Sequence, residues 1–184
     1  GFNSIGIASS GGAGRVTAEW MINGYMNEDL FSLDIKRFQK FHSSKKFIME
    51  RVTETLGDLY GMHWPYKQHK TSRNQRLLPY HQELKNAGAC FGVSGEYERP
   101  MWYAINNEKA EYKYSFDYQN WYPSVEFETK NTVTNVGLYE LSPFSKYEVK
   151  GELAHTELQR ICTANIKNEI GRSTYTQMLN KAGG

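Results

Sequence analysis

The sequence lacks the features that mark several common classes of protein. It has only two cysteines, Cys90 and Cys162, far apart and in no CxxC arrangement, which argues against a disulfide framework or a zinc site. No apolar run approaches the roughly 18 residues that cross a bilayer, so we expect no membrane segment. The 22 basic and 20 acidic residues are interspersed along the chain, and no nucleic-acid partner is indicated. These absences favour a globular protein of a reducing compartment.

The chain also lacks an initiator methionine, because it begins at Gly1 and ends on two glycines. We therefore expect it to be a segment of a longer protein. Its 184 residues can form one ordinary domain or parts of two, and a hydrophobic fraction of 39% is adequate for a core. Thirteen tyrosines predict that the packing relies on amphipathic rings.

Apolar periodicity and capping residues predict a mixed α+β fold. Helical spacing between suitable caps predicts helices over 12–23, from Ser43 or Ser44 to Gly61, and over 80–87, 125–135 and 153–162. Short apolar or alternating stretches predict strands over 2–7, 89–93, 136–141 and 146–150, and a strand or an extended arm over 112–122. The stretch 61–79 has few apolar residues and is typical of a long loop.

The opening GFNSIGIASSGGAG is the most informative local motif. A strand that runs through a glycine-rich turn into a helix places free amides and the positive end of the helix dipole at one spot. Such a spot attracts an anion or an electron-rich ring edge. The dinucleotide fingerprint GxGxxG is not met, because the register supplies Gly11, Gly12 and Gly14. The alternative interpretation is that these glycines only permit close packing of helix on strand.

Two other groups of residues carry weaker signals. Three histidines and two acids have spacings that match no familiar metal site and are interrupted by a proline loop, so we expect no metal. A modest basic stretch without regular aromatic interleaving indicates a solvated loop, or contacts to carboxylates or a partner domain. The first group is His63, His69, His81, Asp58 and Glu83, and the second is Lys67, Lys70, Arg73 and Arg76.

Longer motifs carry a resemblance to a known family. They are GFNSIGIASSGGAGRVTAEW, DIKRF, SRNQRLLPYHQELKNAGACF, GEYERPMWY, GLYELSPFSKYEVKG and YTQMLNKAGG. In this order they resemble the dimethylglycine and sarcosine dehydrogenases, flavoproteins fused to a folate-binding domain like the aminomethyltransferase of the glycine cleavage system. The resemblance implies the end of an FAD-dependent amine oxidoreductase domain over 1–36, its central domain over 37–97, and the start of the aminomethyltransferase-like domain over 98–184.

The resemblance also implies cofactors and contact residues. FAD is expected to lie against the opening motif, whose amides would stabilise the charge that hydride transfer leaves on the ring. Tetrahydrofolate is expected in the second domain, and the catalytic residues would lie outside this chain. The implied contacts are Phe2, Asn3, Ser4, Ile5, Gly6 and Ile7 for the flavin, with Gly11 and Gly12 supporting the turn, and Tyr175 for the folate.

The implied activity is oxidative demethylation of a small N-methylated amino acid, dimethylglycine or sarcosine. The one-carbon unit would be released as formaldehyde or passed to tetrahydrofolate, and electrons would leave to an electron-transfer flavoprotein or to oxygen. Bacterial cytoplasm or mitochondrial matrix is the implied compartment. Two alternatives stay open: a non-catalytic regulatory subunit of the same architecture, as in pyruvate dehydrogenase phosphatase, and a free-standing aminomethyltransferase with an N-terminal extension.

Overall fold

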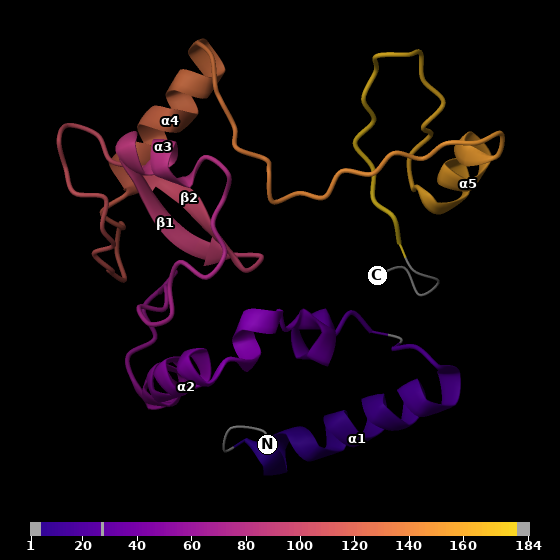
Figure 1. Ribbon diagram of the computed structural model, residues 1–184, viewed down its shortest axis with the longest axis horizontal. Coiled ribbons are helices and arrows are strands. Elements are labelled where there is room, and N and C mark those ends of the chain that lie inside the picture. Colours follow the sequence, from indigo (N-terminus) through magenta and orange to yellow (C-terminus); the bar gives the residue numbers. More distant parts are fainter. Residues whose placement is uncertain (1–4, 27, 180–184) are drawn as a thin grey trace. The chain divides into compact units, whose positions relative to one another are not determined.

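A computed structural model describes residues 5–26 and 28–179 of the chain (Figure 1). It contains five α-helices and one pair of strands within those residues, which confirms the mixed α+β class. The elements are α1 (Gly6–Asn23), α2 (Lys45–Tyr60), α3 (His81–Asn86), β1 (Ala89–Ser94), β2 (Tyr97–Tyr103), α4 (Tyr122–Thr134) and α5 (Ala154–Ile161), with 3₁₀ turns at Phe31–Leu33, Ile35–Arg37 and Lys40–Ser43.

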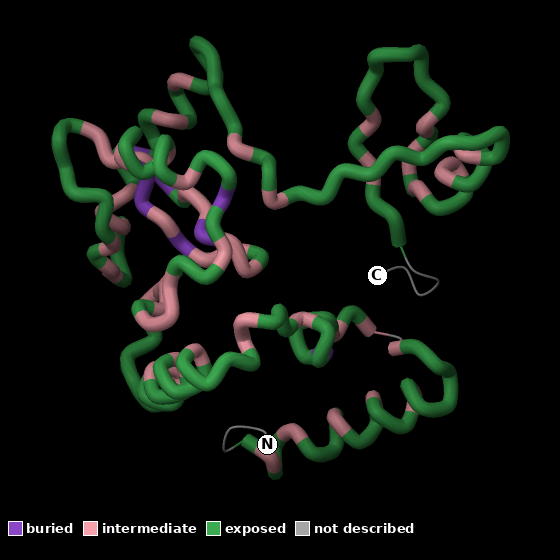
Figure 2. The backbone as a smooth tube through the Cα atoms, in the orientation of Figure 1, coloured by how far each residue is buried: buried purple, intermediate pink, exposed green. Residues whose placement is uncertain are grey.

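The chain divides into two compact units. One unit comprises residues 38–145, and the other comprises residues 1–37 together with 146–184. Most of the buried positions lie in the first unit, around the two strands (Figure 2). Side chains held in place by burial are therefore concentrated in this unit.

The core of the 38–145 unit is an antiparallel hairpin covered by aromatic rings. β1 and β2 pair from Ala89 with Tyr103 to Ser94 with Tyr97, and the register shifts once near Cys90. Trp102 is only 1% exposed, and the rings of Tyr112 and Trp121 pack beside it.

A tight turn joins the two strands. Gly95 and Glu96 have φ of 58° and 67°, the left-handed pair that a two-residue hairpin turn requires. The sequence pattern predicts β1 correctly but gives no sign of β2.

Predicted helices in this unit are confirmed, and their caps explain where they begin and end. The Ser44 hydroxyl accepts a hydrogen bond from the Phe47 amide at the start of α2. Gly88, with φ of 87°, follows α3, as a left-handed position favours glycine. In α4 a proline at the first turn suits the missing amide hydrogen bond of that position.

Three predicted strands of the described chain are wrong or only partly right. No strand forms over 112–122, where the rings of Tyr112 and Tyr114 stack 5.5 Å apart and the Asn120 side chain bonds the backbone of Glu111 and Lys113. The extended-arm alternative is not confirmed either, because the segment bends at 116–118 and these hydrogen bonds fold Asn120 back onto its start. No strand forms over 136–141 or 146–150 either, because neither stretch meets a sheet edge that would pair its amides.

The opening segment also differs from the prediction. α1 begins at Gly6 and runs through the glycines without a turn, so the expected strand over 2–7 and the expected glycine-rich turn are wrong for the described residues. Gly24 ends α1 as predicted, with φ of 76° and its amide bonded to the Trp20 carbonyl. In the same unit, the predicted helix over 153–162 is confirmed as α5.

Candidate functional site

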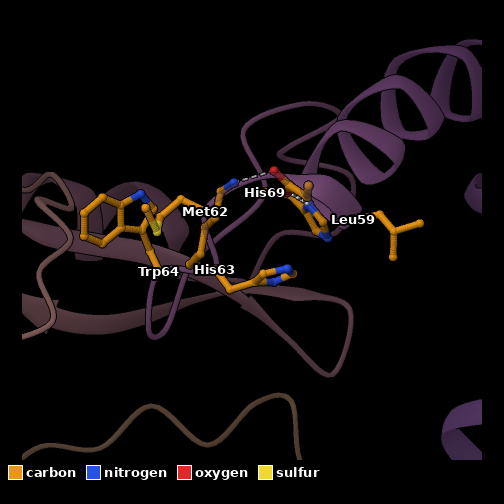
Figure 3. Close-up of a pocket in the computed structure, with 7 residues that line it drawn as sticks. Leu59, Met62, His63, Trp64 and His69 are labelled. Carbon is orange, nitrogen blue, oxygen red and sulfur yellow. Dashed lines mark hydrogen bonds and ion pairs between the residues drawn. The ribbon is translucent and has the colours of Figure 1, made fainter.

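A pocket of about 290 Å³ lies where α2 ends and the long loop begins. Figure 3 shows the side chains of Leu59, Met62, His63, Trp64 and His69 around it. Asp58 and Lys67 complete the lining. The pocket thus combines apolar walls with two imidazoles, a carboxylate and an ammonium group, a composition suited to a small polar ligand or ion.

Three chemically active groups meet at the edge of this pocket. Glu54 and Asp58 are four residues apart on α2, which puts both carboxylates on one face of the helix. His69 comes from the loop, and its Nδ1 lies 3.8 Å from Glu54 Oε1 and 3.8 Å from Asp58 Oδ2. All three ligand atoms lie within 4.8 Å of one another. Among the described residues, the buried Nδ1 atom has no hydrogen-bond partner.

The Glu54 carboxylate holds the loop onto α2. It accepts hydrogen bonds from the Lys70 amide at 2.6 Å, the Thr71 amide at 2.9 Å and the Thr71 hydroxyl. Burial by itself raises the pKa of Glu54, but these hydrogen bonds outweigh it and lower the pKa to about 2. Glu54 is therefore ionised at neutral pH, and both of its carboxylate oxygens accept hydrogen bonds from the loop.

A second carboxylate fixes the far end of the loop. Glu98, on β2, is 2% exposed and accepts hydrogen bonds from Arg73 and from the Asn74 amide. Burial raises the pKa of Glu98, whereas these hydrogen bonds, led by that from the Arg73 guanidinium, lower it below its usual value. Arg73 also donates to the Phe91 carbonyl at 3.0 Å, so the loop is tied to both strands.

The structure brings together only some members of the predicted group of histidines and acids. Asp58, His63 and His69 line the same pocket, whereas His81 lies against the Phe91 ring, with centroids 4.2 Å apart. Glu54 was missed by sequence reasoning, although its spacing of four from Asp58 was a usable signal.

The carboxylate interpretation of the basic stretch is confirmed for two of its members. Lys67 pairs with Asp58 and Arg73 with Glu98. A third member, Arg76, lies over the Tyr97 ring, 3.8 Å from its centroid. The loop is therefore held in place largely by charge.

The residues expected near the flavin lie in or before α1. Phe2, Asn3 and Ser4 fall outside the described residues. Ile5 is the N-cap of α1, and Gly6 and Ile7 open its first turn. Gly11 and Gly12 lie inside the helix, so they support no turn, and a Cβ on either would meet nothing within 4 Å of the described chain. Contact with a flavin stays a prediction for all of these positions.

The residue expected in the folate pocket is on the surface. Tyr175 is 90% exposed, next to a segment in which Thr163 and Gln177 exchange hydrogen bonds. A second pocket of about 330 Å³ lies between β2, α4 and residues 136–141 of the 38–145 unit, whereas Tyr175 belongs to the other unit. The folate contact of Tyr175 stays a prediction.

Comparison with known families finds two matches in order along the chain. Residues 23–77 match the family described as FAD dependent oxidoreductase central domain. Residues 80–184 match the family described as GCVT N-terminal domain. The predicted domain limits 36/37 and 97/98 stay predictions, and the second falls within β2. The two matches nevertheless support the predicted order of the central and aminomethyltransferase-like domains.

Individual relatives match the whole of this chain. It is 40% identical over 184 residues to 4-methylaminobutanoate oxidase (formaldehyde-forming) of Paenarthrobacter nicotinovorans, covering 100% of this chain and 22% of that protein. It is 32% identical to the mitochondrial pyruvate dehydrogenase phosphatase regulatory subunit of Mus musculus, and 28% identical to the mitochondrial sarcosine dehydrogenase of the same organism. Those two alignments cover 100% of this chain, and 22% and 23% of the relatives. The chain thus spans about a fifth of the length of the curated relatives it matches.

Among the described helices, none is both long and apolar enough to cross a bilayer.

Proposed function

This chain belongs to the family of the dimethylglycine and sarcosine dehydrogenases, and on that premise we propose that it is part of an FAD-dependent oxidative demethylase of an N-methylated amino acid. The observation that carries the proposal is the 40% identity, over the whole chain, to a relative named as a formaldehyde-forming 4-methylaminobutanoate oxidase. The order of an oxidoreductase central domain followed by a GCVT N-terminal domain supports it.

The proposed reaction is a two-electron oxidation of the substrate. A bound FAD would supply the acceptor for a hydride from the N-methyl carbon, and the nitrogen lone pair would form the new C=N bond of an iminium ion. Water adds to that carbon and releases formaldehyde and the shortened amine, or tetrahydrofolate captures the carbon as a methylene group. The electrons then pass to oxygen or to an electron-transfer flavoprotein. Dimethylglycine, sarcosine and 4-methylaminobutanoate are the substrates to compare.

The start of α1 fits one part of this chemistry. The first amides of an α-helix have no acceptor within the helix, and the helix dipole places partial positive charge there. In α1 these are the amides near Gly6 and Ile7, and Gly6 has no side chain to separate them from a ligand. An anionic ring edge would be stabilised at that position. Gly11 and Gly12 cannot contribute in this way, because their amides lie inside the helix.

The experiment uses the full-length protein. Purified protein should carry flavin absorbance that bleaches anaerobically with one of the three substrates, and formaldehyde should appear in air. The substitution Gly6→Leu should slow flavin reduction, while Gly11→Leu, inside the same helix, serves as the matched control. A flavin that none of the substrates reduces would refute the demethylase proposal and favour the regulatory alternative. The 32% identity to the phosphatase regulatory subunit supports that alternative.

Folate capture is tested separately in the same protein. With tetrahydrofolate present, free formaldehyde should fall as methylene-tetrahydrofolate forms. Tyr175→Ala should weaken this capture, and Tyr147→Ala is the matched control, since the two tyrosines are 90% and 87% exposed. Equal capture in both variants would remove Tyr175 from the folate site and leave the demethylase proposal standing. Bacterial cytoplasm or mitochondrial matrix stays the expected compartment.

A further inference from the structure

One buried polar atom in the cluster of Glu54, Asp58 and His69 makes no hydrogen bond within the described part of the chain. Nδ1 of His69 is buried and has no partner among the described residues. Both facing carboxylate oxygens lie 3.8 Å away, which is too far for a hydrogen bond. A buried polar atom left in this state costs free energy. The nitrogen and the two oxygens thus face one another at ion-pair distance without a direct hydrogen bond.

The two separations from the imidazole nitrogen are close to those of a metal site, and the two carboxylate oxygens lie within 4.8 Å of each other. Bonds of about 2.1 Å in tetrahedral geometry put neighbouring ligand atoms roughly 3.4 Å apart. The two distances of 3.8 Å are a few tenths of an ångström longer, a difference that a small side-chain rotation removes. The three atoms come from two positions on one rigid helix and one position on a loop that is tied to that helix.

The surrounding hydrogen bonds leave lone pairs on the two carboxylate oxygens that face His69, so these oxygens can bind an ion. Asp58 uses its other oxygen, Oδ1, to pair with Lys67, so Oδ2 keeps its lone pairs. Glu54 Oε1 accepts one hydrogen bond, from the Lys70 amide, and a carboxylate oxygen has a second lone pair. Outer partners of this kind orient the ligands of a metal.

The donor set selects the type of ion. An imidazole nitrogen with two carboxylate oxygens suits Zn²⁺ or Co²⁺, whereas Ca²⁺ and Mg²⁺ prefer oxygen alone. Lys67 offsets part of the negative charge of the two carboxylates, which further disfavours Ca²⁺ and Mg²⁺. Three protein ligands beside a pocket leave one coordination position open to a small molecule.

We propose that Glu54, Asp58 and His69 bind one divalent transition-metal ion, represented by Zn²⁺, with its open position facing the pocket at the end of α2. The ion adds a further link between the helix and the loop, besides the hydrogen bonds to Glu54 from Lys70 and Thr71 and the pair of Lys67 with Asp58. Binding stabilises the folded chain by an amount that grows with the logarithm of the free Zn²⁺ concentration, because the unfolded chain does not hold the three ligands together.

The test measures Zn²⁺ binding to the whole chain after treatment with a chelator. Calorimetry should give one site per chain, and added Zn²⁺ should raise the melting temperature. Co²⁺ should give the absorption of a tetrahedral or five-coordinate ion and quench Trp64, which lines the pocket.

His69→Gln and Asp58→Asn should each weaken the binding of Zn²⁺ at least about tenfold, since even the loss of an outer partner costs that much in known sites. His155→Gln is the control, because this histidine lies on α5, outside the 38–145 unit. Circular dichroism shows whether each variant is folded, and X-ray absorption of the Zn²⁺-loaded parent, which needs no variant, should detect one imidazole. Stoichiometric binding that both variants retain, or no binding by the parent at micromolar Zn²⁺, would overturn the proposal.

Discussion

Replacing Glu98 with glutamine should destabilise the 38–145 unit more than any change on its surface. The carboxylate is 2% exposed and accepts two hydrogen bonds from Arg73 and one from the Asn74 amide. A glutamine has the same shape, but it brings an NH₂ group toward the guanidinium and leaves a partly buried cation without its counterion. Breaking a buried pair in this way costs about 3–5 kcal/mol.

We take the lower end of that range, because the Arg73 side chain is 23% exposed and can regain some water. With an m-value of about 2 kcal/mol per M, a loss of about 3 kcal/mol lowers the urea midpoint by about 1.5 M. Trp102 is 1% exposed, so its fluorescence reports the unfolding of this unit. The control is Glu126→Gln on α4, whose ion pair with Lys130 lies on the surface and should leave the midpoint unchanged.

Two outcomes are informative about the pair. In the double variant Arg73→Met with Glu98→Gln, the loss should be smaller than the sum of the single losses, because the unpaired cation is gone. If Glu98→Gln lowers the midpoint no more than Glu126→Gln does, the hydrogen bonds at Glu98 do not stabilise the unit and the reasoning fails.

Two further predictions concern acid and thiol reagents. Glu54 titrates near pH 2 in the folded chain instead of 4.5, so the unfolded chain takes up the proton first and stability falls between about pH 4.5 and 2; the shift corresponds to about 3 kcal/mol at most. Acid unfolding followed by circular dichroism should show a shallower decline in Glu54→Gln, and an unchanged decline would contradict the assignment. Burial raises the pKa of the Cys90 thiol to about 11, so its reaction with an aromatic disulfide at pH 8 should be slow. The fast phase should disappear in Cys162→Ser, and its disappearance in Cys90→Ser instead would show that Cys90 is accessible.

Local signals were sufficient to predict most of the helices. Ser44 and Gly24 act through hydrogen bonds to residues a few positions away, so their effect is visible in a short stretch of sequence. β2 was missed because its turn places Glu96, a residue type uncommon there, in the left-handed region. Strands were predicted over 136–141 and 146–150 from alternation alone, but a strand also needs an edge to pair with, and that is not a local property.

The opening motif shows that a glycine-rich stretch does not by itself determine the local backbone conformation. Glycine permits a turn but does not require one, and the helix-compatible residues around Gly11 and Gly12 let the helical hydrogen bonds continue from Gly6. The family was recognisable because several long motifs occur in order. The local geometry at the expected flavin contact was not, because a resemblance transfers residue roles without fixing the conformation of one chain.

The loop over 61–79 explains why the candidate site was only half visible in the sequence. It has few apolar residues, so its hydrophobic pattern does not indicate which elements it packs against. Glu54 and Asp58 on α2 hold its middle, and Glu98 on β2 holds its end. Each contact joins a basic side chain or a backbone amide to a carboxylate 9 to 25 residues away.

Such pairings depend on which elements come together in space, so spacing along the chain cannot reveal them. They also make the loop sensitive to protonation in a way that a packed loop is not. When Glu54 is neutralised, β1 and β2 should keep their pairing, whereas the loop should lose its hydrogen bonds from the Lys70 and Thr71 amides to that carboxylate. Its amides should then exchange hydrogen with solvent at acid pH before those of β1 and β2.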